Sequence, residues 1–336
     1  MSYSKPTIVS KHYASFAQRL PRQEGRTVAI TGTTSGTGFV AARTAAELGA
    51  RVLLLNREST RASSSLDALR SAVPQGDFEP VVCDLQSFAS VRTAAQRVHA
   101  LCPSGLDVLC NNAGVMALED VATADGFDVQ MQTNHLSHFL LTKLLWPLLE
   151  QSTDARVVNH SSIARLSVKT LEARYLGKNG GSLGGNGSSM LFGGARWVRY
   201  GQTKLANAAF TAALHARAQQ AGSSVKALVA HPGLANTELQ VTSIREGGMG
   251  ALFTGLMMRT SQSSEDGALG ILSGMFLPEA ESGQFWGPGA SMMAMKGPAT
   301  SFPLERRYDN EATRELLWAE SCKAIGEDFE LSAPAT

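Results

Sequence analysis

The sequence predicts an α/β fold in which a doubly wound parallel sheet of about seven strands is covered by helices on both faces. Three observations predict it. Short apolar runs alternate along the chain with longer segments of helical spacing. The apolar runs lack polar alternation, as expected for strands that are covered on both faces. The chain has 336 residues, of which 43% are hydrophobic, so it can bury a large core.

Each element follows from its local pattern. A β-branched run at residues 27–31 (TVAIT) predicts the first strand, and alanine-rich helical spacing at 39–48 predicts the first helix. Similar apolar runs predict strands at residues 51–55, 78–83, 107–110, 156–161 and 225–230. Amphipathic spacing between these runs predicts helices at residues 61–72, 87–101, 125–149 and 200–220. Strands that alternate with helices in this way form parallel βαβ units.

Two segments interrupt the alternation. Residues 177–194 hold eight glycines in eighteen positions, which predicts a flexible insertion because glycine loses the most backbone entropy on ordering. Residues 235–298 contain seven of the eleven methionines. No linker separates either segment from the predicted sheet. We therefore expect one domain with loop insertions at residues 25–325, preceded by an N-terminal extension (1–24) and followed by a C-terminal tail (326–336).

Charge and cysteine usage exclude several classes of function. With 30 basic and 29 acidic side chains the formal net charge is +1, so neither a nucleic-acid partner nor a charged lipid surface is indicated. The four cysteines form no CxxC or Cys/His pattern, which argues against a metal site or a disulfide framework and favours the reducing cytoplasm. No apolar run approaches the roughly 20 residues of a transmembrane helix.

The N-terminal extension allows two interpretations. Residues 2–23 contain basic side chains and no acid, together with an apolar stripe at Val9, Tyr13, Phe16 and Leu20. Such a pattern is typical of an organelle transit peptide, so targeting by residues 1–23 is one interpretation. The other is a helix that packs on the domain or on a partner subunit.

A glycine-rich turn separates the first strand from the first helix. Residues 31–38 have the sequence TGTTSGTG, which predicts a pyrophosphate site where the backbone comes close to the ligand at the helix N-terminus. A tight turn without a ligand is the alternative. The candidate cofactor-binding residues of this turn are Gly32, Ser35, Gly36 and Gly38.

The preference for one nucleotide is expected at the end of the second strand. Arg57 lies there and can bind a 2′-phosphate through its guanidinium, and no Asp occupies the strand end. The sequence therefore favours NADP(H) over NAD(H), with a solvated loop arginine as the alternative. Asp84 follows the third strand, where it can accept a hydrogen bond from an adenine amino group.

A tyrosine and a lysine are the candidate acid–base pair. Tyr200 and Lys204 open the predicted helix 200–220 four residues apart, and so lie on one face. A neighbouring ammonium lowers the pKa of a phenol, ordinarily about 10, toward the range that suits general acid–base catalysis. By itself the pair also fits an ordinary amphipathic helix.

Other polar residues lie where they can join this pair. Ser161 and Ser162 end the fifth strand, and Asn134 lies in the predicted helix 125–149, where its amide could hold a water for proton relay. Further candidates follow the fourth and sixth strands. Open parallel sheets bind ligands at this carboxyl edge. The strand-end candidates are Asn112, Gly114, His231, Pro232 and Gly233.

The chain resembles the short-chain dehydrogenase/reductase family over roughly residues 25–325. The motifs that carry the resemblance are TGTTSGTG, NNAG, QTNHLSHF, VVNHSS, YGQTK and HPGLANTEL. The resemblance implies a Rossmann-type fold and an NAD(P)-dependent reaction. It implies that Tyr200 transfers a proton to or from the substrate oxygen, which Ser162 positions. Lys204 would lower the Tyr200 pKa and hold the nicotinamide ribose, and Asn134 would maintain the relay. The residues it implies for cofactor contacts are Asn112 at the adenine ribose, and Pro232, Gly233 and Thr237 around the nicotinamide and pyrophosphate.

Within the family the chain is most similar to the retinol dehydrogenase and protochlorophyllide reductase-like branch, through YGQTKLAN, NHLSHFLLT and SGQFWGPG. Tyr200 lies 38 positions after Ser162, farther than in compact members, and no N-terminal membrane anchor is expected. We expect an enzyme that interconverts a carbonyl and an alcohol on an apolar substrate. A light-dependent C=C reductase and a non-catalytic NADP(H)-binding regulator are the alternatives.

The resemblance also predicts a covering region for the substrate and an assembly. Residues 235–265 would form a pliable apolar lid, with ordinary core packing as the other interpretation of their side chains. Family habit implies a homodimer or homotetramer. The side chains expected in the lid are Met249, Phe253, Met257 and Met258.

Overall fold

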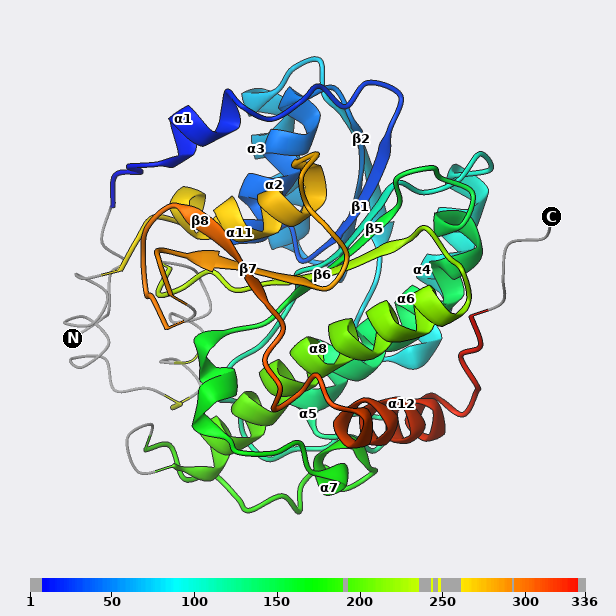
Figure 1. Ribbon diagram of the computed structural model, residues 1–336, viewed down its shortest axis with the longest axis vertical. Coiled ribbons are helices and arrows are strands. Elements are labelled where there is room, and N and C mark those ends of the chain that lie inside the picture. The colour runs from blue at the N-terminus through cyan, green and yellow to red at the C-terminus, as the bar shows by residue number, and fades with distance from the viewer. Residues whose placement is uncertain are drawn as a thin grey trace.

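The computed structural model describes residues 8–189, 193–235, 243, 247–248, 261–291 and 293–331 (Figure 1). These residues form an eight-stranded sheet in the order β3-β2-β1-β4-β5-β6-β7-β8. The predicted doubly wound parallel sheet is confirmed, and β8 extends it as an edge strand antiparallel to β7. The strands are β1 (Thr27–Thr31), β2 (Arg51–Asn56), β3 (Asp77–Val82), β4 (Val108–Asn111), β5 (Arg156–His160), β6 (Lys226–Ala230), β7 (Gln284–Pro288) and β8 (Ala299–Pro303).

Helices cover both faces of the sheet (Figure 1). One layer contains α2, α3 and α11, and the opposite layer contains α4, α6 and α8, with α12 outside α8. Short helical segments connect these layers. The helices are α1 (Tyr13–Ala17), α2 (Gly36–Glu47), α3 (Thr60–Ala72), α4 (Phe88–Leu101), α5 (Val129–Met131), the π-helix Gln132–Leu136, α6 (Ser137–Leu149), the 3₁₀-helix Ile163–Ser167, α7 (Ala173–Leu176), α8 (Ala195–Gln220), α11 (Ser264–Phe276) and α12 (Glu311–Ile325).

The strand order places a ligand site between β1 and β4. From β1 the chain adds β2 and β3 on one side, then returns to add β4 and later strands on the other. The paired register of Val28 with Val108 and of Ile30 with Cys110 brings the carboxyl ends of these two strands together. Ligands bind in the crevice at such a reversal of strand order.

Two predicted helices differ from the structure at their starts. The helix expected at residue 200 begins at Ala195, which places Tyr200 in its second turn. The helix expected from residue 125 begins at Val129, where the Asp128 carboxylate caps it by accepting from the backbone N–H groups of Gln130 and Met131, both at 3.0 Å. The helix then widens into a π-helical turn that contains Asn134.

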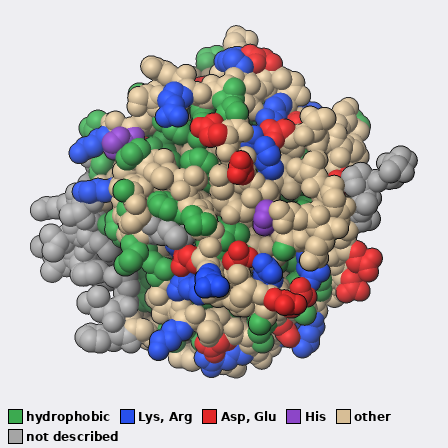
Figure 2. All heavy atoms as spheres, viewed as in Figure 1, with side chains coloured by type: hydrophobic (Ala, Val, Ile, Leu, Met, Phe, Trp, Pro, Cys, Tyr) green, Lys and Arg blue, Asp and Glu red, His purple; other side chains and the backbone are tan. Residues whose placement is uncertain are grey.

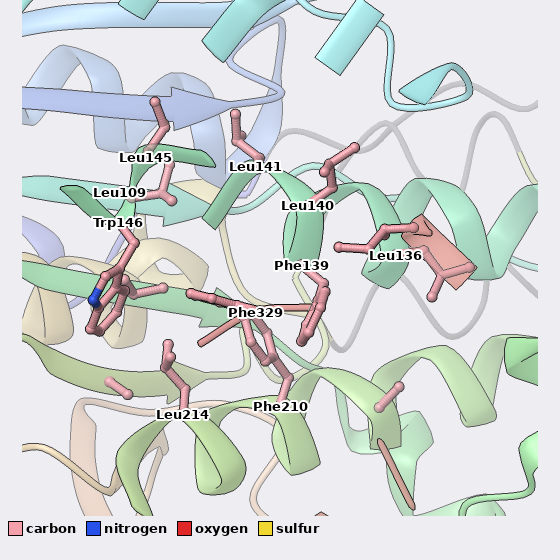
Figure 3. Packing of buried hydrophobic residues seen from close by; sticks show 14 of the residues in the cluster. Leu109, Leu136, Phe139, Leu140, Leu141, Leu145, Trp146, Phe210, Leu214 and Phe329 are labelled. Carbon is pink, nitrogen blue, oxygen red and sulfur yellow. The ribbon is translucent and has the colours of Figure 1, made fainter. Parts of the chain in front are cut away.

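The predicted C-terminal tail takes part in the core up to Leu331. Figure 3 shows Phe329 among the aromatic side chains that α6 and α8 bury. Its ring lies 5.5 Å from Phe139 in a T-shaped pair and 5.0 Å from Trp318 in a stacked one. Aromatic contacts of this kind add to the energy of area burial. The chain end beyond α12 therefore closes the α6/α8 layer.

The glycine-rich insertion is organised by a distant carboxylate. Asp120 accepts hydrogen bonds from the backbone N–H groups of Gly181, Leu183 and Gly185 at 2.7–2.9 Å. Arg199 of α8 donates to the Gly185 carbonyl at 2.8 Å, and its side chain is 1% exposed. The expectation of a flexible loop rested on its glycine content alone. Composition does not show that Asp120, some sixty residues earlier in the chain, accepts hydrogen bonds from the backbone N–H groups of the loop.

The described part of the N-terminal extension packs on the α2/α11 layer. Tyr13, Phe16 and Leu20 are buried, and the Tyr13 hydroxyl is 2.6 Å from Thr44 Oγ1 of α2. The buried carboxylate of Asp266 on α11 accepts from the backbone N–H groups of residues 11–13 and from the Ser10 hydroxyl. These contacts fit the interpretation of this segment as a helix that packs on the domain.

Replacing Asp266 by Ala is expected to lower the free energy of unfolding by about 2 kcal/mol, because it leaves several buried donors without an acceptor. Burial raises the Asp266 pKa, but hydrogen bonds from Lys11, His12 and Ser10 outweigh it and hold the pKa below its ordinary value. The stabilisation is thus present above pH 3.8 and lost as pH falls through the lower folded pKa. Urea denaturation at several pH values measures both effects.

Glu265→Ala is the control, because it removes only a part-exposed ion pair to Arg43. It should lower the free energy of unfolding by less than about 1 kcal/mol. A loss as large as that of Asp266→Ala would contradict the role given to the Asp266 hydrogen bonds.

Figure 2 shows acidic and basic side chains interspersed on the visible face, in keeping with the small net charge. Within the described ranges, no helix is long and apolar enough to cross a bilayer. Thr237 and the four predicted lid side chains (Met249, Phe253, Met257 and Met258) lie outside the described residues.

Candidate active site

A cleft of about 520 Å³ opens at the carboxyl ends of β1, β2, β4 and β5. It extends from the glycine turn to α8, and so joins segments that are far apart in the sequence. Gly38, Asn134 and Gly233 lie outside the cleft lining. The predicted site residues that line the cleft are Gly32, Ser35, Gly36, Arg57, Asp84, Asn112, Gly114, Ser162, Tyr200, Lys204 and Pro232.

The glycine turn has the backbone conformation that its sequence requires. Gly32 (φ +72°) and Gly36 (φ +60°) occupy the left-handed region, which favours glycine. Ser35 is the N-cap residue of α2, so the free N–H groups of the first helical turn face the cleft. Gly38 is needed for a different reason, since a Cβ there would lie 2.3 Å from both Asn112 Nδ2 and the Gly32 carbonyl oxygen.

Gly38→Ala is expected to lower the free energy of unfolding by about 3 kcal/mol, because an inserted methyl group would displace backbone as well as a side chain. The shifted turn should also weaken dinucleotide binding. Gly274→Ala in α11 is the control, since the nearest atoms to its Cβ would be the Val158 methyl groups, at 3.2 and 3.4 Å, and no backbone atom would come as close as at Gly38. Thermal denaturation and a binding titration measure both variants. If the two variants lose equal stability, the packing argument for Gly38 is wrong.

Asn112 holds the turn in place. Its Nδ2 donates to the carbonyl oxygens of Thr31 (2.9 Å) and Gly32 (3.1 Å), and its Oδ1 accepts from Thr37 Oγ1 (2.9 Å). The family resemblance implies that Asn112 lies against the adenine ribose. In the structure its amide is occupied by these protein contacts, so it positions the β1–α2 turn against the end of β4.

The end of β2 presents two arginines to the cleft. Asn56 is engaged with the turn, because its Oδ1 accepts from the Thr33 N–H at 2.9 Å. Arg57 and Arg61 both line the cleft, and Arg61 Nη2 lies 3.3 Å from Ser35 Oγ. Neither guanidinium has an ion-pair partner within the described residues. Arg61 was missed from the sequence, although its place four residues after Arg57, at the start of a capped helix, was a signal.

Asp84 also lines the cleft, and it follows β3, the strand that pairs with β2. Its carboxylate accepts from the backbone N–H of Gln86 at 2.9 Å, and its own N–H donates to Ser90 Oγ at 2.9 Å. These contacts fix the loop after β3 at the wall of the cleft.

Tyr200 and Lys204 converge below the glycine turn. Tyr200 is 4% exposed, and burial raises its pKa to about 12, while a hydrogen bond with the Ser162 side chain acts in the opposite direction. Burial also lowers the pKa of Lys204 to about 8. Lys204 Nζ donates to the His160 carbonyl oxygen at 3.0 Å and lies 5.8 Å from the centre of the Tyr200 ring.

The expected lowering of the Tyr200 pKa by Lys204 is therefore wrong for this structure. A buried phenolate loses its hydration, and this cost outweighs the opposing hydrogen bond with Ser162. Lys204 is desolvated as well, and its nearest acceptor is a backbone carbonyl rather than the phenol. The phenol is consequently protonated at neutral pH.

The two serines after β5 differ in their contacts. Ser161 Oγ donates to the Lys204 carbonyl oxygen at 2.6 Å, so its hydroxyl ties β5 to α8. Ser162 caps the 3₁₀-helix by accepting from the Ala164 N–H at 3.2 Å, and its side chain also reaches Tyr200. Ser162 is the one placed to share a substrate oxygen with the phenol.

Asn134 braces the segment after β4. Its side chain accepts from the Val115 N–H at 2.7 Å and donates to Thr203 Oγ1 at 2.9 Å. A Cβ at Gly114 would lie 3.2 Å from Asn134 Oδ1 and 3.3 Å from Lys204 Nζ. Gly114 thus leaves room for both the Asn134 and the Lys204 side chains, and the Asn134 amide itself is bonded within the protein.

The loop after β6 closes the cleft on its other side. Pro232 lines the cleft, and Gly233 (φ +62°) packs so tightly that a Cβ would lie 2.3 Å from the Met295 carbonyl oxygen. Gln262 Nε2 donates to the Pro232 carbonyl oxygen at 2.7 Å. This contact joins the loop to the segment that leads into α11.

An apolar cluster borders Tyr200. It consists of Met116, Ala117, Trp197 and Tyr200, with Ala164 packed against it. The Trp197 ring is T-shaped to Tyr200 at 6.0 Å, and its indole N–H lies 3.1 Å from the carbonyl oxygens of Ser188 and Gly248. Trp197 therefore joins α8 to the glycine-rich insertion and to part of the predicted covering region.

Two buried histidines near the cleft are hydrogen-bonded inside the protein. His138 Nε2 lies 2.9 Å from Thr31 Oγ1, and His135 Nε2 lies 2.9 Å from Ser321 Oγ. Burial lowers the pKa of His138 to about 4 and of His135 to about 3. The described part of the chain contains no cluster of three or more His, Cys, Asp or Glu side chains suited to a metal ion.

Comparison with known proteins adds to this geometry. A family model described as "short chain dehydrogenase" matches residues 26–176. Retinol dehydrogenase 12 of Mus musculus is 33% identical over 309 residues, covering 91% of this chain and 88% of the relative. Polyprenol dehydrogenase of Mus musculus is 31% identical over 320 residues, covering 91% and 86%. A solved structure of an uncharacterised protein from Mycobacterium paratuberculosis is 32% identical, with a TM-score of 0.70 and coverage of 97% and 100%.

Proposed function

Because the chain belongs to the short-chain dehydrogenase/reductase family and is an oxidoreductase, we propose that it interconverts a carbonyl and an alcohol on an apolar substrate with NADP(H). The observation that carries the proposal is the buried, protonated phenol of Tyr200 next to the Ser162 hydroxyl. These two groups can hold one substrate oxygen between them.

The residues of the cleft supply the proton chemistry. When bound, the nicotinamide donates a hydride to the substrate carbon in reduction or accepts one in oxidation. In the reductive direction Tyr200 gives its proton to the substrate oxygen as the alcohol forms, and in oxidation it takes that proton back. The raised pKa keeps the phenol protonated at neutral pH, which is the form that reduction requires. Ser162 orients the oxygen, and Lys204 is placed to hold the nicotinamide ribose.

Three features of the cleft fit a phosphorylated dinucleotide. The left-handed glycines and the N-terminus of α2 suit a pyrophosphate. Ser35, Arg57 and Arg61 surround one corner of the cleft at the end of β2, where they can bind a 2′-phosphate. No Asp or Glu side chain terminates β2, since its last residue is Asn56. NADP(H) is accordingly proposed over NAD(H).

The relatives narrow the proposed substrate. Retinol and polyprenol, named in the two mouse relatives, are both apolar isoprenoid alcohols. The apolar cluster around Tyr200 suits a substrate of this kind, because it offers side chains without charge beside the reacting oxygen. We include aldehydes with isoprenoid chains in the proposed substrate class.

A substrate panel tests the proposal. NADPH oxidation is followed by absorbance with retinal, shorter isoprenoid aldehydes, aromatic aldehydes, ketones and quinones, and products are identified by mass spectrometry. We expect carbonyl reduction, fastest on the apolar aldehydes. Reduction of a C=C bond with the carbonyl retained, or dinucleotide binding without turnover on any compound, would overturn it.

A further inference from the structure

Ala117 has an unfavourable backbone conformation next to the cleft. Among the residues that the structure describes, it is the only one other than glycine with a positive φ, at +52°. A Cβ makes this left-handed conformation unfavourable, so it persists only where the surrounding structure holds it. The Ala117 side chain is fully buried in the apolar cluster that contains Tyr200. The strained residue therefore lies beside the proposed general acid.

The turn at Ala117 determines which side chains face the cleft. Successive side chains of an extended chain point to opposite faces. Here Met116 and Ala117 are both buried in the cluster with Tyr200, whereas Leu118 and Glu119 both line the cleft. The left-handed residue thus interrupts the alternation. It brings Leu118 to the cleft wall directly after two residues of the Tyr200 cluster.

Two arginines of α8 hold this turn. Arg196 Nη1 donates to the Ala117 carbonyl oxygen at 3.3 Å, and Arg199 Nη2 donates to the Leu118 carbonyl oxygen at 3.0 Å. Both side chains are almost fully buried, with exposed fractions of 6% and 1%. They lie in the turn of α8 that directly precedes Tyr200. The backbone at residues 117 and 118 is therefore fixed to the helix that carries the proposed general acid.

The glycine-rich insertion holds the same two arginines from another side. Arg196 Nε donates to the Asn186 carbonyl oxygen at 3.1 Å, and Arg199 Nη1 donates to the Gly185 carbonyl oxygen at 2.8 Å. Hydrogen bonds from a charged donor are stronger than those between neutral groups. Each guanidinium thus joins the insertion to the turn at Ala117, which leaves the turn little freedom to move.

The resulting wall presents an apolar side chain on a fixed backbone. Glu119 follows Leu118, and its carboxylate is paired with Arg196 Nη2 at 3.0 Å. Leu118 has no polar group and is partly exposed in the cleft. If Tyr200 binds the substrate oxygen, the groups attached to the carbonyl carbon come next to this wall. A branched side chain on a fixed backbone rejects a substrate that is too wide, because neither can yield without strain.

We propose that Leu118 is a specificity-determining residue, which the turn at Ala117 holds so that it limits the width of the substrate beside its carbonyl group. The inference rests on the proposed function, because it concerns the substrate of the same site. Such a limit admits aldehydes whose chain is unbranched next to the carbonyl group. It disfavours aldehydes that branch there and ketones with two large substituents.

Two aldehydes of the same composition measure this limit. Octanal is unbranched, whereas 2-ethylhexanal has its branch next to the carbonyl group. The readout is the ratio of kcat/KM for 2-ethylhexanal to kcat/KM for octanal, at saturating NADPH. We expect the wild type to prefer octanal and Leu118→Ala to raise the ratio about 10-fold, the discrimination that a few carbon atoms give in an apolar pocket. NADPH affinity should change by less than about 3-fold.

Ala117→Gly tests the turn while Leu118 stays in place. Glycine adopts the left-handed conformation without strain and has more conformations open to it, so the fold should persist while the wall becomes more mobile. We expect the ratio to rise about 3-fold. We also expect faster amide hydrogen exchange at residues 115–121, measured by mass spectrometry, which does not depend on turnover.

Val121→Ala is the matched control. Val121 is an exposed apolar side chain of the same cleft wall, four residues after the turn. Its truncation should leave the ratio within about 2-fold of the wild type.

Three results would overturn the inference. One is an unchanged ratio in an active Leu118→Ala enzyme, and another is an equal rise in Val121→Ala, which would show a general widening of the cleft. The third is an unchanged ratio in Ala117→Gly despite faster exchange, which would mean that the turn does not set the limit. Wild-type protein that reduces neither aldehyde contradicts the proposed function itself, a result distinct from an unchanged ratio.

Discussion

Tyr200→Phe is expected to lower kcat for carbonyl reduction by about 10³-fold, the contribution typical of a positioned general acid. The substitution removes one oxygen from a ring that packs against Trp197, so the apolar cluster and the cleft should persist. NADPH affinity should change by less than about 3-fold, because the phenol acts on the substrate oxygen. Steady-state kinetics with the best aldehyde of the panel, together with a calorimetric NADPH titration, measure both quantities.

Tyr175→Phe is the control for this variant. Tyr175 is equally buried, but it lies outside the cleft lining and its hydroxyl contacts Arg174 at 3.0 Å. It should keep kcat within about 2-fold of the wild type. If Tyr200→Phe retains more than about a tenth of the wild-type kcat, Tyr200 is not the general acid.

The double variant Arg57→Ala with Arg61→Ala is expected to weaken NADPH binding about 100-fold and to leave NADH binding within about 3-fold of the wild type. Each charge-assisted hydrogen bond contributes about 1.5 kcal/mol or more, so the loss of two corresponds to roughly this factor. NADH lacks the 2′-phosphate, so it gains nothing from the two guanidiniums. Titrations with both dinucleotides give the ratio directly.

Arg70→Ala, at the opposite end of α3, is the control for overall charge. Its side chain is exposed and lies outside the cleft lining. It should leave both affinities unchanged. An equal loss of NADPH and NADH affinity in the double variant would mean that the arginines do not bind the 2′-phosphate.

Local pattern was sufficient for the elements of the sheet and for the phosphate turn. The strands from β1 to β6 begin and end close to the predicted residues, because continuous apolar runs bounded by turn residues leave few alternatives. Gly32 and Gly36 have the left-handed conformation that the turn needs. The start of α8 was missed, since residues 195–199 (ARWVR) combine a charged and an aromatic pattern that gives no boundary signal.

Several roles in the site could not be read from the chain because they depend on partners far away in sequence. Asn112 binds the turn formed by residues about eighty positions earlier, and Asp120 binds backbone more than sixty positions later. Arg61 reaches the cleft because α3 starts beside Ser35. No local sequence motif indicates these contacts, because each of them joins residues that are far apart in the chain.

By itself the sequence determined the sheet, because periodicity is a local property of the chain, and its motifs supplied the glycine turn and, through the family resemblance, the tyrosine, serine and lysine of the proposed site. Only the tertiary structure decided the protonation of these groups. Burial raises the pKa of Tyr200 and lowers that of Lys204. Desolvation and hydrogen-bond partners depend on how distant segments pack, and no local pattern contains that information.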